Sequence, residues 1–268
     1  MAWIAPKTNW SAADGVRDSD FNRIEGNTLE LYNTKARQDE FEALKTRVNN
    51  GLFDIAQRTA IGNIGIGIEI GLYENSVLVP FIKLSNNYEG TGRNLVVRKD
   101  AYKMDVLFNT ADTYYSNSKQ DTWLNNSYLQ LLDQLTQNVI TPVSIEVLSD
   151  VGTGTIDRRA FILSLGEYNQ DTAQGISWLG EGITYFSSNA RRVARFNGNI
   201  VPHWTRSVHA VSPRTAACIS TTGDGSGSLQ VATTYSAGIR PAFTLPPDFE
   251  VIGSIPSTAN IMAIAEVV

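Results

Sequence analysis

The sequence contains little cysteine and little histidine. Its one cysteine, Cys218, cannot close an intramolecular disulfide, and the run Ala216-Ala217-Cys218-Ile219 predicts a small buried side chain. The two histidines, His203 and His209, are not accompanied by further ligands at a recognised spacing. We therefore expect no metal site and no cofactor.

Charge is also sparse. Only 18% of the residues are charged and 42% are hydrophobic, which argues against disorder and indicates a folded core. The formal net charge is -5 and the basic residues are scattered, so nucleic acid is not an expected partner. No run reaches the roughly 18 to 20 apolar residues of a membrane helix, and the first residues lack the features of a secretory signal. We expect synthesis in the cytoplasm without membrane insertion.

The sequence also lacks a recognised catalytic motif. Ser207 and His209 could form a nucleophile and base, but no G-x-S-x-G turn accompanies them. Glu167, Asp171 and Glu181 could supply the two carboxylates of a glycosidase, although loop carboxylates are more often solvated. The sequence therefore predicts a protein without enzymatic activity.

Residues 1–60 are predicted to form an attachment unit. Residues 1–17 contain proline, glycine and the tryptophans Trp3 and Trp10, which indicates an extended arm that docks on a surface. Capping residues then open a helix over 18–50, where apolar side chains recur every three or four residues. At the usual rise per residue such a helix spans about 45 Å.

One small domain does not easily cover a helix of this length. Self-association, as in a trimeric coiled coil, is the preferred interpretation. The alternative is a helical hairpin that folds back on its own domain, with a break at 33–39. The residues predicted to attach or oligomerise the chain are Trp3, Trp10, Phe21, Ile24, Leu31, Phe41, Leu44 and Val48.

Residues 61–268 are predicted to form a β-rich domain. Isoleucines alternate with small or polar residues over 64–72, which predicts a strand with one apolar face. The glycines in this run do not open a helix, so they do not form a dinucleotide-binding loop. Further strands are predicted at 77–84, 94–98, 104–108, 143–148, 159–165, 217–222, 229–234, 239–245, 249–253 and 261–267.

Two helices complete the predicted domain. Residues 121–135 begin with a capping residue and carry an apolar face, and a weaker helix is predicted within 180–195. Arg240 lies between Ile239 and Pro241, and we expect it to be partly buried and to donate to backbone carbonyls. The predicted fold class is α+β, with an N-terminal helical segment before a mainly antiparallel β domain.

The N-terminal motifs carry a family resemblance. Asn9-Trp10, followed by Val16-Arg17-Asp18-Ser19-Asp20-Phe21-Asn22-Arg23-Ile24-Glu25, resembles the attachment segment of phage tail and fibre proteins. In those families a tryptophan arm leads into a D-x-N-R-I-E helix that joins a particle.

Residues 77–253 resemble a domain of unassigned function found in phage structural proteins and Gram-positive surface proteins. Its W-x-R-S and G-[IV]-R-P-A-F elements are similar to those of the C-type-lectin-like fold of the formylglycine-generating and retroelement-diversified families. In that fold a bent antiparallel sheet with two helices exposes a loop-rich binding face. The matching segments are Asp121-Thr122-Trp123-Leu124-Asn125, Phe161-Ile162-Leu163-Ser164-Leu165, His203-Trp204-Thr205-Arg206-Ser207 and Gly238-Ile239-Arg240-Pro241-Ala242-Phe243-Thr244-Leu245.

Together the resemblances imply a virion structural protein, a tail-fibre or baseplate protein that forms a homotrimer and joins other virion proteins. Its C-terminal domain would contact a host cell-surface glycan or protein. The protein would assemble in the host cytoplasm and be released by lysis. A head fibre or capsid decoration protein and a surface-polysaccharide hydrolase are the alternatives.

The loop region 197–235 is the predicted binding surface, because aromatic side chains among small polar residues suit recognition. Core positions for Trp204 and Tyr235, and a structural role for Arg206, remain open alternatives. The predicted ligand-binding residues are His203, Trp204, Arg206, His209, Arg214 and Tyr235.

Overall fold

A computed structural model of the chain shows two compact units, residues 1–56 and residues 57–268. The residues that the structure describes are 27–29, 31, 35, 38, 42, 58–109, 114–116, 118–170, 176, 178–209, 215–225, 229–231 and 234–253.

The described residues of the first unit are all α-helical, in agreement with the helix predicted over 18–50. Gln38 Nε2 donates to Glu42 Oε1 at 3.1 Å, a contact between successive turns. Leu29 and Leu31 are 55% and 64% exposed. Leu31 therefore has an uncovered apolar side chain in the single chain. The other predicted attachment residues lie outside the described residues; they are Trp3, Trp10, Phe21, Ile24, Phe41, Leu44 and Val48.

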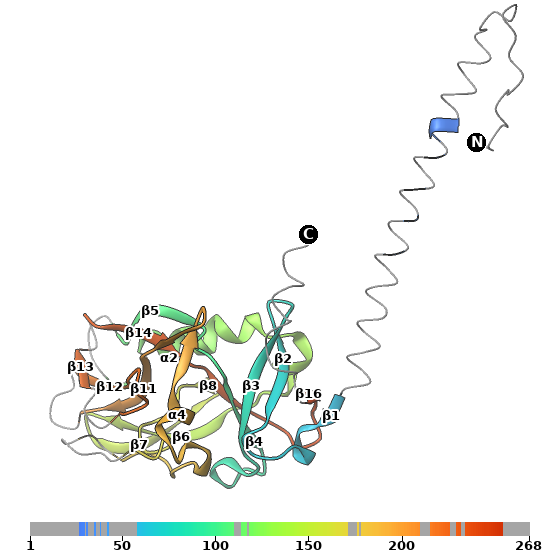
Figure 1. The fold of residues 1–268 in the computed structure, drawn as a ribbon. Helices are drawn as coiled ribbons and strands as arrows, with labels where there is room; N and C mark the ends of the chain where they lie inside the picture. The colour runs from blue at the N-terminus through green and yellow to red at the C-terminus, as the bar shows by residue number, and fades with distance from the viewer. Residues whose placement is uncertain are drawn as a thin grey trace, which may run out of the picture. The chain divides into compact units, whose positions relative to one another are not determined.

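The second unit is built on a seven-stranded antiparallel sheet (Figure 1). Strands from both ends of the unit meet in it, because β1 pairs with β16 and β16 pairs with β2. The predicted strands at 77–84, 94–98 and 249–253 are confirmed. In sheet order the strands are β1 (Arg58–Ala60), β16 (Glu250–Gly253), β2 (Glu69–Glu74), β3 (Val77–Ser85), β4 (Asn94–Arg98), β15 (Ala242–Leu245) and β8 (Ala160–Phe161).

A five-stranded sheet and two hairpins complete the strands of the described residues. β11 lies inside the five-stranded sheet, antiparallel to β12 and parallel to β14. The order is β13 (Leu229–Val231), β12 (Thr215–Ile219), β11 (His203–Val208), β14 (Ser236–Ile239) and β5 (Lys103–Leu107). The hairpins are β6 (Val143–Ser149) with β7 (Gly152–Arg158), and β9 (Ala194–Phe196) with β10 (Asn199–Val201).

The single helix predicted over 121–135 is wrong. The chain forms α2 (Lys119–Asn126), the 3-10 turn η3 (Tyr128–Leu131) and α3 (Gln134–Val139). The break has a local cause: the Asp133 carboxylate accepts hydrogen bonds from the backbone N–H groups of Leu135 and Thr136 and so starts a new helix.

The helix predicted within 180–195 is likewise shorter than expected. It consists of the 3-10 turn η4 (Thr184–Phe186) and the single turn α4 (Asn189–Arg192).

The strand predicted over 64–72 begins only at Glu69, and the 3-10 turn η1 (Ile61–Asn63) precedes it. Lys83 explains the difference, since its buried Nζ donates to the carbonyls of Ile61 and Ile64 at 2.6 Å each. These carbonyls are satisfied by a lysine instead of a neighbouring strand. Gly67 then turns the chain with a φ of +83°.

The strand predicted over 159–165 is mostly wrong, because only Ala160–Phe161 pairs in a sheet. β7 instead occupies Gly152–Arg158, between the predicted strands 143–148 and 159–165. The strand predicted over 239–245 holds in part, because it is divided into β14 and β15 around Arg240 and Pro241. The strand predicted at 261–267 lies outside the described residues.

The prediction that 197–235 is a binding loop misses the central strand of the smaller sheet. All six residues of β11 are buried, although the three in the middle of the strand, Thr205, Arg206 and Ser207, have charged or hydroxylated side chains. Thr205 Oγ1 donates to the Ala217 carbonyl at 2.9 Å, and Trp204 Nε1 donates to the Val106 carbonyl at 2.7 Å. Partners distant in the sequence thus make a polar strand compatible with burial.

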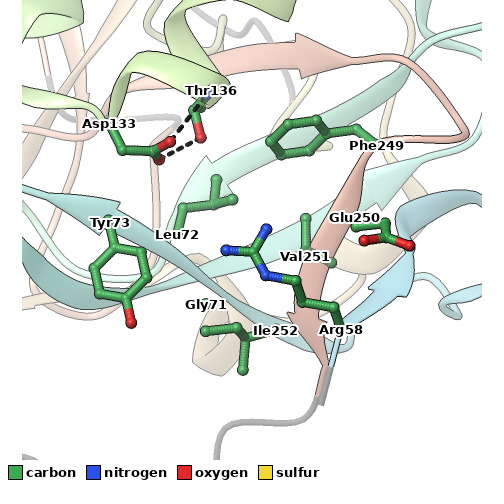
Figure 2. Close-up of a pocket in the computed structure, with 10 residues that line it drawn as sticks. All are labelled: Arg58, Gly71, Leu72, Tyr73, Asp133, Thr136, Phe249, Glu250, Val251 and Ile252. Carbon is green, nitrogen blue, oxygen red and sulfur yellow. Dashed lines mark hydrogen bonds between the residues drawn. The ribbon is translucent and has the colours of Figure 1, made fainter. Parts of the chain in front are cut away.

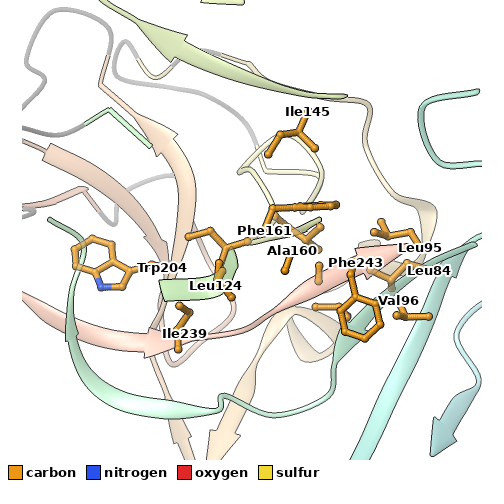
Figure 3. Packing of buried hydrophobic residues seen from close by; sticks show 14 of the residues in the cluster. Leu84, Leu95, Val96, Leu124, Ile145, Ala160, Phe161, Trp204, Ile239 and Phe243 are labelled. Carbon is orange, nitrogen blue, oxygen red and sulfur yellow. The ribbon is translucent and has the colours of Figure 1, made fainter. Parts of the chain in front are cut away.

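One continuous apolar cluster connects the sheets and the helices (Figure 3). Phe81 and Phe243 pack at a ring-centroid distance of 5.4 Å within the larger sheet. Trp204 packs edge-on against Phe108 at 5.4 Å in the smaller one. Cys218 is buried, as predicted. The second unit is therefore an α+β domain dominated by antiparallel strands, with short helices.

Within the described residues, no helix has both the length and the apolar character needed to span a membrane.

Candidate functional site

Three of the predicted ligand-binding residues are completely buried. His203, Trp204 and Arg206 are each 0% exposed and line none of the three hollows described below, so a ligand bound in those hollows does not touch their side chains. The prediction that they bind a ligand directly is therefore corrected, and the open alternatives of a core tryptophan and a structural arginine hold. Their apparent loop position in the sequence is the interior of β11.

Two of the other three predicted residues, His209 and Tyr235, are only half-buried. His209 is half-buried, and its backbone N–H donates to the Thr215 carbonyl. Tyr235 is half-buried and packs perpendicular to Trp204 at a centroid distance of 5.7 Å. Arg214 lies outside the described residues.

Arg206 is the centre of a buried ion pair. Its guanidinium donates from Nη1 to Glu167 Oε2 at 2.5 Å and from Nη2 to Glu167 Oε1 at 2.9 Å. The remaining donors reach the carbonyls of Glu146 and Ile162 at 2.9 and 3.1 Å. Both partners are 0% exposed, and the two-pronged geometry is the one that best compensates two charges removed from water.

Glu167 connects this ion pair to the surface through Tyr88. The Tyr88 hydroxyl donates to Glu167 Oε1 at 2.5 Å, and the Ser164 backbone N–H donates to Oε2 at 2.7 Å. Burial first, and then the Glu167 charge, raise the pKa of Tyr88 well above its ordinary value. Its ring also stacks on Phe161 at 5.6 Å. Arg206 therefore positions Tyr88 by way of Glu167.

Tyr88 lines a surface hollow of about 390 Å³, which we call the Tyr88 groove. This volume falls within the usual range of small-ligand sites, about 300–1,000 Å³. Its polar lining residues are Ser85, Asn87, Tyr88, Glu89, Glu181 and Thr184.

Glu89 is a carboxylate of the groove that combines partial burial with an unusual backbone conformation. Burial, followed by the charge of Glu167, raises its pKa above the ordinary value for glutamate. Its φ of +49° places it in the left-handed region that favours glycine. Strained backbone and a shifted pKa both occur more often at functional sites than elsewhere. The Tyr88 groove is therefore the candidate binding site.

Comparison with known proteins places the chain in a family. Residues 91–247 match the model of a domain of unknown function, DUF6273. The chain belongs to the DUF6273 family. No curated protein and no solved structure matches it significantly.

The DUF6273 match includes the Arg206–Glu167 ion pair, whereas Tyr88 and Glu89 lie just before it. It also includes Arg240, which is 1% exposed. Arg240 Nε donates to the Arg98 carbonyl at 2.8 Å, and its guanidinium lies 5.8 Å from the centre of the Phe186 ring. The prediction that Arg240 is a buried donor to backbone carbonyls is confirmed.

Among the described catalytic candidates of the DUF6273 domain, Glu167 and Ser207 are buried, while Glu181 lines a surface groove. Glu167 is neutralised by Arg206, and Asp171 lies outside the described residues. Ser207 is 0% exposed, and its Oγ accepts from the Leu165 backbone N–H at 2.9 Å. Glu181 lines the Tyr88 groove. In the part of the chain that the structure describes, no three His, Cys, Asp or Glu side chains gather as a metal site.

A second hollow lies beside β2 and β16 of the DUF6273 protein (Figure 2). The side chain of Arg58 extends over it, and the Asp133 carboxylate accepts from the Thr136 hydroxyl at its rim. Its volume is about 20 Å³, which accommodates about one water molecule. It is too small for an organic ligand.

Two further ion pairs, each with a buried carboxylate, were not predicted from the sequence. Glu74 accepts from Arg98 and from the Tyr128 hydroxyl, the latter at 2.9 Å. Asp121 accepts from Arg158 Nε at 2.6 Å. A charged residue at an otherwise apolar strand position, such as Glu74 in β2, is the signal that could have indicated burial with a partner.

Proposed function

We propose that the protein is a non-enzymatic component of a phage or phage-like particle, a tail-fibre or baseplate protein that binds a host surface. The observation that carries the proposal is that Leu29 and Leu31 have uncovered apolar side chains, which are 55% and 64% exposed. Both residues belong to a helical unit that is distinct from the β-rich unit. Such side chains are most simply covered by further copies of the helix or by another particle protein.

The resemblance of the N-terminal segment to phage attachment segments supports the same proposal. In this proposal residues 1–56 join the particle as a trimeric coiled coil, and the β-rich unit has a C-type-lectin-like fold that is directed to the host. The buried arginines Arg206 and Arg240 support that fold assignment, since they hold loops to the sheets through carbonyl contacts.

Recognition would use the Tyr88 groove, which offers hydroxyl, amide and carboxylate groups to a host-surface glycan or protein. A single shallow site of this kind binds weakly. Three linked copies would reach a much higher effective affinity, because the second and third binding events become intramolecular.

The experiment that tests the proposal is immunogold electron microscopy of particles released from the producing culture, with antibodies raised against the β-rich unit. Gold at the tail appendages is the expected result. Gold on the capsid would instead support a head fibre or decoration protein. Recovery of the whole chain in the particle-free fraction would overturn the proposal.

A surface-polysaccharide hydrolase is the second candidate, and the placement of Glu89 and Glu181 in one groove favours it. A glycosidase needs one carboxyl group with a raised pKa, as Glu89 has. Release of reducing sugar from host envelopes by the purified chain, lost in Glu89→Gln and in Glu181→Gln, would establish this function in place of the first.

A further inference from the structure

A third hollow lies between the edge strand β5 and the first turn of α2, apart from the Tyr88 groove. Its volume is about 110 Å³. We call it the Trp123 pocket, defined by Lys103, Asp105, Lys119, Gln120, Trp123 and Ile239.

A β-bulge shapes one wall of the Trp123 pocket. Lys103 pairs with Ile239 and Val106 pairs with Ala237, so two residues of β5 lie opposite one residue of β14. Asp105, one of the two, has a φ of +57°. Bulges redirect side chains and are common beside functional sites, and aspartate is one of the few residues that adopt this backbone conformation readily.

Gln120 gives the pocket an unsatisfied acceptor. The side chain is 0% exposed, and Oε1 has no hydrogen-bond partner among the described residues. Its Nε2 donates to the Leu107 carbonyl at a long 3.4 Å. A buried amide oxygen without a donor is unfavourable, so this atom is suited to a ligand that brings a hydroxyl or N–H group.

Trp123 provides a rigid aromatic wall. It is half-buried, and its ring packs against Tyr102 at 5.2 Å and against Tyr128 at 5.5 Å. Tyr128 is itself fixed by its hydrogen bond to Glu74. A tryptophan held in this way offers apolar area to a ligand at little cost in conformational entropy.

The charges at the rim favour an anion. Lys103 and Lys119 are exposed and line the pocket with a single carboxylate, that of Asp105. Neither lysine forms an ion pair with a described residue. The local balance is therefore one net positive charge in a protein whose formal net charge is -5.

We propose that the Trp123 pocket binds one residue of an acidic saccharide, a pyranose ring that bears a carboxylate. The apolar face of the ring lies on Trp123, ring hydroxyls donate to Gln120 Oε1 and Asp105, and the carboxylate meets the two lysines. The volume is below the roughly 300 Å³ of a drug-sized site, so one sugar ring enters and the rest of the chain stays outside. The proposal goes beyond the proposed function, since it assigns a ligand class to a separate site.

Isothermal titration of the full chain with uronic-acid trimers tests the proposal. The probes are trimers of galacturonate, mannuronate and guluronate, together with neutral galactotriose and inorganic phosphate. At least one uronate trimer should bind roughly tenfold more tightly than galactotriose, and added salt should reduce that difference because the charges are exposed. Phosphate alone should not compete, since it has no ring to contact Trp123.

Variants locate the site. Lys103→Gln/Lys119→Gln should weaken uronate binding roughly three- to tenfold and leave galactotriose unchanged. Gln120→Leu should weaken binding of both roughly three- to tenfold. Lys99→Gln, at a lysine that is paired with Glu69 outside the pocket, is the matched control for the lysine changes.

Three outcomes would overturn the proposal. They are equal binding of neutral and acidic trimers, phosphate binding as tight as uronate binding, and pocket variants that bind like the unmodified chain. None of these depends on where the chain lies in a particle. The test therefore separates failure of this inference from failure of the proposed function.

Discussion

Arg206 and Glu167 are both fully buried, and each supplies the charge that the other requires. The surrounding donors and acceptors are also used, because Tyr88 and Ser164 donate to the carboxylate while carbonyls accept from the guanidinium. At the scale of single residues, then, the one charge of the W-x-R-S element, that of Arg206, acts inside the protein. Arg206 is also linked to Tyr88 through Glu167.

Removal of one member of this ion pair should strongly destabilise the folded state. Arg206→Met leaves Glu167 buried without its counter-charge, and we expect the free energy of unfolding to fall by about 3–5 kcal/mol. Urea denaturation followed by circular dichroism measures the change. Arg206→Met/Glu167→Leu should recover much of the loss, because no charge then remains unpaired.

The control for that experiment is an exposed ion pair. Lys99 and Glu69 are 33% and 34% exposed at a distance of 2.7 Å, and Lys99→Met should cost less than about 1 kcal/mol. Equal losses of unfolding free energy in Arg206→Met and Lys99→Met would contradict the prediction that a buried ion pair is the more costly one to break.

The buried His203 should make the free energy of unfolding depend on pH. Burial, and after it the charge of Arg240, lowers the pKa of His203 well below its ordinary value. The unfolded chain binds a proton below about pH 6.5 while the folded chain does not, so stability is full above that pH and falls as the pH decreases. The loss should approach about 1.4 kcal/mol per pH unit until the folded pKa is reached.

Urea denaturation at a series of pH values from about 7.5 to about 5 measures this slope. His203→Gln should reduce the slope, although it loses the contact between Nε2 and the Tyr168 hydroxyl at 3.1 Å. His209→Gln is the matched control at the other histidine. An unchanged slope in His203→Gln would contradict the prediction.

At the scale of elements, short capped segments replace the longer ones expected from periodicity. α2 begins where the Ser118 hydroxyl accepts from the Asp121 backbone N–H, and α3 begins at Asp133. The apolar side chains over 121–135 do recur with helical spacing, but they belong to three successive short elements, α2, η3 and α3, that contact the same core. Capping side chains therefore determine where each helix starts, while packing determines which side is buried.

A variant of Asp133 tests whether the capping side chain stabilises the start of α3. Asp133→Ala removes an acceptor used by the Leu135 and Thr136 backbone N–H groups at 3.0 and 3.1 Å. We expect the free energy of unfolding to fall by about 1 kcal/mol. Asp133→Asn keeps an N-cap acceptor and should stay close to the unmodified chain in the same urea titration. Equal losses in the two variants would show that the charge of Asp133, and not its capping geometry, stabilises α3.

At the scale of the whole molecule, the chain divides into a helical unit and a β-rich unit. The β-rich unit has a continuous core and buries the Arg206–Glu167 ion pair. The helical unit exposes Leu29 and Leu31. Assembly is therefore expected to depend on the first unit and recognition on the second.

Light scattering coupled to size-exclusion chromatography tests the assembly. The full chain should elute with the mass of an oligomer, in our proposal a trimer, and Leu29→Gln/Leu31→Gln should shift it toward the monomer because the apolar contact is lost. Val151→Gln changes a 92% exposed side chain in the β-rich unit and should leave the mass unchanged. A monomer at high concentration for the unmodified chain would contradict the prediction.

Several parts of this protein were predictable because their signals are local. Uninterrupted apolar runs predicted β3 and β4, the heptad-like spacing predicted the helix that contains Leu31, and the neighbours of Cys218 predicted its burial. In each case the residues that form the structure are adjacent in the sequence. Periodicity and composition are therefore sufficient.

Only the tertiary structure decided whether β11 is buried and where the candidate site lies. In the sequence the polar residues of β11 resemble a binding loop. They are buried because their partners are distant in the sequence: Glu167 is 39 positions from Arg206 and 79 from Tyr88. The Trp123 pocket likewise depends on a bulge between β5 and β14. Burial of a charge is favourable only where a distant partner compensates it, and a linear pattern does not contain that pairing.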